Sequence, residues 1–162
     1  MALNPKCVGT TYPPAQPYPV EPQTIRRFAE AVGDPAPVYT DPAAAQSLGH
    51  PDVLAPPTFP FIVVARAMEE VFRYEDIGFD PTYLIHGNQR FDYTRPVRAG
   101  DRLVTTLEIT GAQTLRGRDV LGLRADLADT DGSHVVTTHM TFVSLSAVEG
   151  GERDDDQRDA QR

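Results

Sequence analysis

The sequence predicts a single α+β domain in which an antiparallel sheet packs on one long helix. Hydrophobic residues recur with helical spacing between residues 22 and 74, and segments rich in β-branched and aromatic residues follow from residue 82 to residue 145. A chain of 162 residues also has the length of one domain. Helices first and a strand meander afterwards are typical of the α+β class.

Two helices are expected in the first third of the chain, after an extended, proline-rich lead-in at residues 11–21. The first helix follows Pro22, places apolar residues at i, i+3, i+4 and i+7, and ends at Gly33. The second helix is short, because Asp41 is a capping residue at its start and Gly49 is a stop signal at its end.

The long central helix and the strands complete the expected fold. Residues 58–74 are the most apolar helical segment, so we expect them to be buried on several sides, with Thr58 as the N-cap. Strands are expected at residues 82–85, 90–94, 103–110, 120–127 and 134–145, with turns at 95–101, 116–119 and 129–133.

The charge of the chain argues against nucleic acid as a ligand. The formal net charge is −8 and the sequence pI is about 4.9, so the basic surface that binds phosphate backbones is not expected. Part of the acidity is concentrated in residues 148–162, which have no apolar anchor. We therefore expect a folded domain at residues 1–147 and a disordered acidic tail at residues 148–162.

A cytoplasmic protein without membrane association is expected. Cys7 is the only cysteine, so it can form no intrachain disulfide and cannot alone hold a structural zinc, which favours a reducing compartment. The first ten residues lack the apolar run of a signal peptide, and no segment approaches the roughly 20 apolar residues of a membrane span.

Several common catalytic chemistries lack their sequence motifs. No serine stands in a G-x-S-x-G elbow, and neither a P-loop nor a G-x-G-x-x-G sequence occurs. The four histidines have no ligand spacing with acidic or cysteine neighbours. The sequence therefore predicts no metal and no cofactor, which leaves either a metal-free mechanism or no catalysis.

Three short motifs occur in order along the chain. Residues 33–39 read GDPAPVY, residues 55–59 read APPTF, and residues 84–101 read LIHGNQRFDYTRPVRAGD. With these motifs the chain resembles the MaoC-like hydratase/dehydratase family, in particular its N-terminal dehydratase-domain type. The resemblance implies a hot-dog fold, in which an antiparallel sheet wraps around one long central helix. It also implies acyl thioesters of coenzyme A or acyl carrier protein as substrates.

Within that family the chain is most similar to the substrate-binding subunit of the two-subunit hydroxyacyl-ACP dehydratase. The family's catalytic loop has the form G-D-x-N-P-x-H. Asp34 matches its aspartate and Pro37 its proline, but Ala36 stands at the asparagine position and Tyr39 at the histidine position. Dehydration needs both an acid and a base, and a tyrosine with a pKa near 10 is a poor proton shuttle at neutral pH. The resemblance therefore implies a partner subunit that supplies the aspartate and histidine.

Each polar candidate in the site also has a structural explanation. Asp34 takes part in the chemistry or in substrate binding, or it is a turn residue that bonds its own backbone. Tyr39 lines a pocket or simply packs. The backbone N–H groups of Thr58, Phe59 and Phe61 are candidate donors to a thioester oxygen, and the resemblance implies this role because such donors form the oxyanion site in the family. The alternative for Thr58 is that it is an ordinary N-cap of the helix.

The apolar and basic candidates have alternatives as well. Phe61, Val64 and Met68 line an acyl tunnel or belong to the core, and His86 contacts substrate or is a structural strand residue. The last candidates are the basic residues of the strand and turn, which contact a pantetheine phosphate or an acidic carrier protein or are simply solvated: Arg90, Arg95 and Arg98.

Three functions remain open from the sequence. The first is the acyl-binding, non-catalytic subunit of a heterodimeric (3R)-hydroxyacyl-thioester dehydratase of the fatty-acid elongation type. The second is a self-sufficient homodimeric hydratase that uses Asp34 with His86, Tyr39 or water. The third is a thioester-binding module without activity, since fold does not fix function. A second hot-dog subunit or a second copy of this chain is expected in each, because the edges of the sheet need cover.

Overall fold

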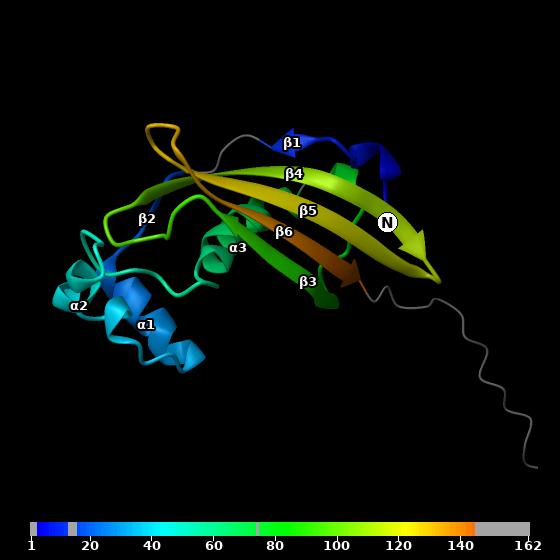
Figure 1. The fold of residues 1–162 in the computed structure, drawn as a ribbon. Helices are drawn as coiled ribbons and strands as arrows, with labels where there is room; N and C mark the ends of the chain where they lie inside the picture. The colour runs from blue at the N-terminus through cyan, green and yellow to red at the C-terminus, as the bar shows by residue number, and fades with distance from the viewer. Residues whose placement is uncertain (1–2, 13–15, 74, 145–162) are drawn as a thin grey trace, which may run out of the picture.

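The computed structural model describes residues 3–12, 16–73 and 75–144. They form a six-stranded antiparallel sheet. Five of its strands follow the order β1-β4-β5-β6-β3, and the sixth, the short strand β2, also pairs with β4. The sheet curves over the long helix α3 (Pro60–Val71), as Figure 1 shows. The predicted α+β class, with an antiparallel sheet around one central helix, is confirmed. The expected acidic tail, residues 148–162, lies outside the described residues.

The centre of the sheet is a meander of three long strands. These are β4 (Arg102–Leu115), β5 (Arg118–Asp129) and β6 (His134–Ser144). Arg116 and Gly117 join the first two strands with φ angles of 51° and 74°, as a two-residue type I′ turn requires. Alternate residues of each strand are buried, so one face of the meander is the core face and the other meets solvent.

The edge strand β3 (Leu84–Tyr93) corrects the sequence prediction of two separate strands at residues 82–85 and 90–94. Both parts pair with β6 in one antiparallel ladder, and the register shifts between His86 and Asn88. Gly87 and Asn88, which lie between the two expected strands, belong to a β-bulge that one continuous strand accommodates. No described strand pairs with the other side of β3.

The helices follow their predicted signals closely, with one correction. Helix α1 (Pro22–Val32) ends at Gly33, which has the left-handed φ of 71°, and the Asp41 side chain accepts a hydrogen bond from the Ala43 N–H at the start of α2 (Pro42–Ser47). Helix α3 is shorter than predicted at both ends, and Thr58 is not its N-cap. Thr58 lies instead in the turn that precedes the helix.

The core lies between α3 and the inner face of the sheet. Val63, Val64 and Met68 of α3 are at most 4% exposed. Phe59, just before the helix, is fully buried and meets Tyr18 and Phe28 edge to face, at ring distances of 6.5 and 5.4 Å. Tyr18 belongs to the short strand β2 (Tyr18–Pro19), which pairs with the start of β4, and β1 (Thr11–Tyr12) pairs with the middle of β4, so the lead-in is extended where it is described. None of the described helices is long and apolar enough to cross a membrane.

Candidate functional site

The loop after α1 keeps Asp34 in a local turn. Gly33 allows the chain to leave the helix, and the Asp34 carboxylate then accepts a hydrogen bond from the Ala36 N–H at 3.2 Å. This is the backbone-bonding arrangement that aspartate forms in turns. The short 3-10 helix η2 (Pro37–Tyr39) follows at once, so two prolines and a hydrogen bond fix the direction in which Tyr39 points.

The Tyr39 hydroxyl lies beside the Asp34 carboxylate. Burial raises the pKa of Tyr39, and the negative charge of Asp34 and a hydrogen bond to its carboxylate raise that pKa further. The phenol therefore stays protonated at neutral pH and donates to the carboxylate. A neutral donor of this kind can orient a ligand, but it cannot shuttle protons at neutral pH as a histidine does.

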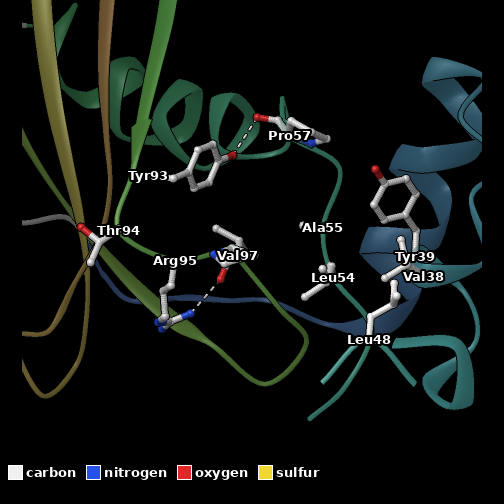
Figure 2. A pocket seen from close by; sticks show the side chains of 11 residues that line it. Val38, Tyr39, Leu48, Leu54, Ala55, Pro57, Tyr93, Thr94, Arg95 and Val97 are labelled. Carbon is white, nitrogen blue, oxygen red and sulfur yellow. Dashed lines mark hydrogen bonds between the residues drawn. The ribbon is translucent and has the colours of Figure 1, made fainter. Parts of the chain in front are cut away.

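A pocket of about 410 Å³ opens beside Tyr39. It lies between the loop that carries Tyr39, the segment before α3 and the turn after β3, and Figure 2 shows Tyr39 and Tyr93 on opposite sides of it. Its volume is in the range of small-ligand pockets, and its walls are predominantly apolar. The lining residues are Val38, Tyr39, Leu48, Leu54, Ala55, Pro57, Tyr93, Thr94, Arg95, Pro96 and Val97.

Backbone hydrogen bonds hold these segments together. The Leu54 N–H donates to the Val38 carbonyl at 3.0 Å, and the Ala55 N–H donates to the Val97 carbonyl at 2.8 Å. The segment before α3 thus ties the wall that carries Tyr39 to the wall that follows β3. The pocket is therefore built on paired backbone, although its lining comes from segments far apart in the sequence.

Tyr93 closes the side of the pocket towards α3. Its hydroxyl donates to the Pro57 carbonyl at 2.7 Å, a contact drawn in Figure 2. Burial raises the pKa of Tyr93 strongly, and the nearby Tyr39 raises it further. The hydroxyl therefore remains a protonated donor, and the ring is held between the end of β3 and the segment that leads into α3.

Two of the three predicted backbone donors at the start of α3 are already occupied. The Phe59 N–H donates to the Pro56 carbonyl at 2.9 Å, and the Phe61 N–H donates to the Thr58 carbonyl at 3.1 Å. Within the described chain, only the Thr58 N–H of these three has no hydrogen-bond acceptor. The expected set of donors to a thioester oxygen is thus reduced to Thr58.

The other apolar candidates lie away from the pocket. Val64 and Met68 belong to the buried core, at 0% and 4% exposure. Phe61 stacks on His86 at a ring distance of 5.0 Å, and His86 also contacts Phe142 at 4.8 Å. His86 therefore joins an aromatic cluster between α3 and the inner face of the sheet. None of these side chains is in the described lining of the pocket.

The basic candidates all have acidic partners. The Arg95 guanidinium contacts Asp101 at 2.7 Å and Asp129 at 3.1 Å, and Arg98 lies 3.5 Å from Asp101. The hydrogen bond to Asp101 raises the pKa of Arg95, as does the charge of both carboxylates. A phosphate at this turn would therefore compete with carboxylates already in place, and Arg95 is the one predicted basic residue that reaches the described pocket lining.

The remaining basic candidate, Arg90, lies on the exposed part of β3. Its guanidinium forms an ion pair with Asp92 at 2.8 Å, and its side chain is 71% exposed.

Among the described residues no group of three or more His, Cys, Asp and Glu side chains could hold a metal ion.

Sequence reasoning found Tyr39 and Arg95 but missed Tyr93, Leu48 and Leu54. Tyr93 and Phe91 both come from the sequence RFDY, in which aromatic residues alternate with charged ones. That alternation indicates a strand face turned towards the interior and was the one available signal. Leu48 lies in the turn after α2 and Leu54 in an isolated β-bridge with Arg98, and at neither place does a periodic pattern mark a residue as part of a pocket.

Comparisons with known proteins agree with one another. The family model described as FAS1-like, dehydratase domain region, matches residues 6–138. A UPF0336 protein of Streptomyces avermitilis is 50% identical over 150 residues, which are 93% of this chain and 100% of that protein.

Solved structures give matches of the same kind. A C-terminally truncated HadBC (3R-hydroxyacyl-ACP dehydratase) complex from Mycobacterium tuberculosis superposes with a TM-score of 0.78 at 28% identity, over 85% of this chain and 97% of that chain. A MaoC-like dehydratase superposes with a TM-score of 0.80 at 33% identity, over 87% of this chain and 43% of that chain.

Proposed function

Because the chain belongs to the FAS1-like dehydratase-region family, within the MaoC-like hot-dog proteins, we propose that it is the acyl-thioester-binding, non-catalytic subunit of a (3R)-hydroxyacyl-thioester dehydratase. The family predicted from the three sequence motifs is confirmed by the family model. The role within the dehydratase is our proposal, and it rests first on Tyr39.

The observation that carries the proposal is the state of the loop at residues 33–39. A dehydratase must remove the α-proton of the substrate and protonate its departing hydroxyl, so two groups that exchange protons near neutral pH must face the substrate. Here the second group is a phenol whose pKa is raised by burial and by the Asp34 carboxylate. This pair can hold its shape and contact a ligand, but it does not provide both proton transfers.

The pocket supports a binding role. Its apolar walls suit an aliphatic acyl chain, while polar groups of Tyr39, Thr94 and Arg95 lie in the same lining and can orient a thioester. Arg95 is held by Asp101 and Asp129, so it is fixed in position before any ligand arrives. A site of this kind binds through shape and burial of apolar surface.

The edge strand β3 supports a partner subunit. Along or next to it, Tyr83, Leu84, Ile85 and Tyr93 are 61%, 36%, 45% and 39% exposed, and no described strand pairs with its outer side. An unpaired edge with exposed apolar residues is a surface on which a second chain can add. The similarity to a chain of the HadBC complex agrees with a second hot-dog subunit there.

The test compares this chain alone, a candidate partner alone and the co-expressed pair. The partner would be a hot-dog protein encoded next to this chain whose loop keeps both aspartate and histidine. Hydration of crotonyl-CoA and of a longer enoyl-CoA is followed by the loss of enoyl absorbance. We expect turnover by the pair, no turnover by this chain alone, and loss of turnover when the partner's loop histidine is replaced.

Two outcomes would replace the proposal. Turnover by this chain alone that disappears in Asp34→Asn would make it a self-sufficient hydratase. Measurable binding of acyl-CoA without turnover, in the presence of every hot-dog partner tested, would make it a binding module without enzymatic activity. In the proposed complex, Asp34→Asn leaves turnover in place, because the partner performs the proton transfers.

A further inference from the structure

We infer that Tyr93 is the residue that limits the length of the acyl chain accepted by the pocket; this inference rests on the proposed function. The phenol ring forms the wall of the apolar pocket on the side of α3. Three observations support this role: the place of Tyr93 in the pocket wall, its attachment to Pro57, and the residues that lie beyond it.

Tyr93 is the last residue of β3, and it is the only residue of that strand in the described lining of the pocket. On the opposite side of the gap, Pro57 is the last lining residue before α3. The hydrogen bond from the Tyr93 hydroxyl to the Pro57 carbonyl joins these two residues at 2.7 Å. The pocket therefore ends at this contact, where strand and segment meet.

The attachment makes the ring a fixed wall. A phenol that swings away gives up its hydrogen bond to the Pro57 carbonyl, which is unfavourable. Partial burial raises the pKa of Tyr93, so the hydroxyl stays protonated and able to donate. An acyl chain that grows towards α3 consequently meets the face of a ring that has no easy alternative position.

Behind the ring lies the inner face of β3, which α3 does not fully cover. Helix α3 packs chiefly on β4 and β6. Phe91, the next residue on the same face of β3, is only partly buried, with its ring 6.3 Å from that of Tyr93. Further along, Phe61 of α3 faces His86 of β3 at 5.0 Å. The inner face of β3 between Phe91 and the Phe61–His86 pair therefore has aromatic rings at both ends. This face would contact the end of a longer acyl chain if the phenol of Tyr93 were absent.

The test measures the affinity of the full-length chain for saturated acyl-CoA thioesters, from butanoyl to dodecanoyl. Each methylene that enters an apolar pocket strengthens binding about fourfold. For the unmodified chain we expect this gain to stop at one chain length, where the acyl end meets Tyr93. In Tyr93→Ala the gain of about fourfold per methylene continues beyond that length.

Further variants separate the wall from a general loss of structure. Tyr93→Phe loses only the hydrogen bond to Pro57 and keeps the bulk of the ring and its contact with Phe91, so it is expected to keep the length limit. Tyr93→Leu, which shortens the side chain but stays apolar, is expected to shift the limit in the same direction as Tyr93→Ala. Tyr83→Ala is the control, because Tyr83 is 61% exposed next to the same strand and does not line the pocket. It should leave the limit unchanged.

The outcomes distinguish this inference from the proposed function. A length limit that stays in place in both Tyr93→Ala and Tyr93→Leu overturns the inference and leaves acyl binding intact. Failure of the unmodified chain to bind any acyl-CoA overturns both. A limit that moves to longer chains in the two shortened variants and stays in Tyr93→Phe supports it.

Discussion

Replacement of Arg95 by alanine is expected to destabilise the domain by about 3 kcal/mol. The reason is the Asp101 carboxylate, whose side chain is 3% exposed and lies 2.7 Å from the Arg95 guanidinium. Loss of one partner of a buried ion pair costs about 3–5 kcal/mol, because the remaining charge stays buried without compensation. The lower end applies here, since Asp101 still accepts from the Arg98 N–H at 3.0 Å and keeps the Arg98 guanidinium at 3.5 Å as an ion-pair partner.

The assay is urea unfolding of Arg95→Ala beside the unmodified chain. In thermal unfolding of the same two proteins, a loss of about 3 kcal/mol at this domain size corresponds to a fall in Tm of roughly 6–12 °C. The matched control is Arg90→Ala, because the Arg90 side chain is 71% exposed and its ion pair with Asp92 lies on the surface. Exposed pairs of this kind contribute about 0.2–1 kcal/mol.

Equal stability losses in Arg95→Ala and Arg90→Ala would refute this reasoning. Arg95 would then be free to act mainly as a contact for a phosphate or a carrier protein, as the sequence suggested. A large loss in Arg95→Ala alone would show that any ligand contact of Arg95 depends on a side chain that also holds the turn together.

Three further predictions concern Tyr39, Met68 and Ile85. The pKa of Tyr39 is raised above its unfolded value near 10, so its contribution to stability is complete below about pH 10 and is lost as the pH rises through the folded pKa. In urea unfolding, the stability advantage over Tyr39→Phe should therefore stay constant up to about pH 10 and shrink above it; a difference that stays constant above that pH would contradict the contact with Asp34. Met68 is 4% exposed in the core, so Met68→Ala should cost about 3 kcal/mol in the same assay without changing acyl-chain preference; a changed preference with little loss of stability would restore its predicted role in a tunnel. Ile85 is 45% exposed on the unpaired edge, so Ile85→Glu should weaken association with a partner in gel filtration while the Tm stays within a few degrees; unaltered association would place the partner elsewhere.

Local signals were enough to predict most of the elements. Gly33 and Asp41 mark helix ends because their conformational and capping preferences act within a few residues. The split of β3 into two strands was wrong, and the residues between the two expected parts include Gly87 and Asn88, types that are rare in strands. Only the pairing of both halves with β6 reveals a bulge, and pairing between distant residues is not encoded in a local pattern.

The site was harder to predict than the fold for a related physical reason. Tyr39 was found because a motif marks its position, whereas Tyr93 became part of the pocket only through its contact with Pro57, which is 36 residues away in the sequence. Arg95 and Arg98 looked like a free basic patch because the sequence does not disclose that Asp101 is buried between them. Burial and ion pairing arise from tertiary packing, which spacing along the chain does not specify.

The position of β3 at the edge of the sheet has a consequence for the order of folding. Strands β4, β5 and β6 follow one another through short turns, whereas β3 pairs with β6 between residues far apart in sequence, such as Leu84 and Ser144. Closing the longer loop costs more chain entropy, so we expect the meander to form first and β3 to dock afterwards. Amide hydrogen exchange should accordingly be faster in β3 than in β5. A chain whose β3 has detached would keep its meander but lose the wall that Tyr93 provides. Ligand binding would therefore be lost at a lower denaturant concentration than the structure of the meander.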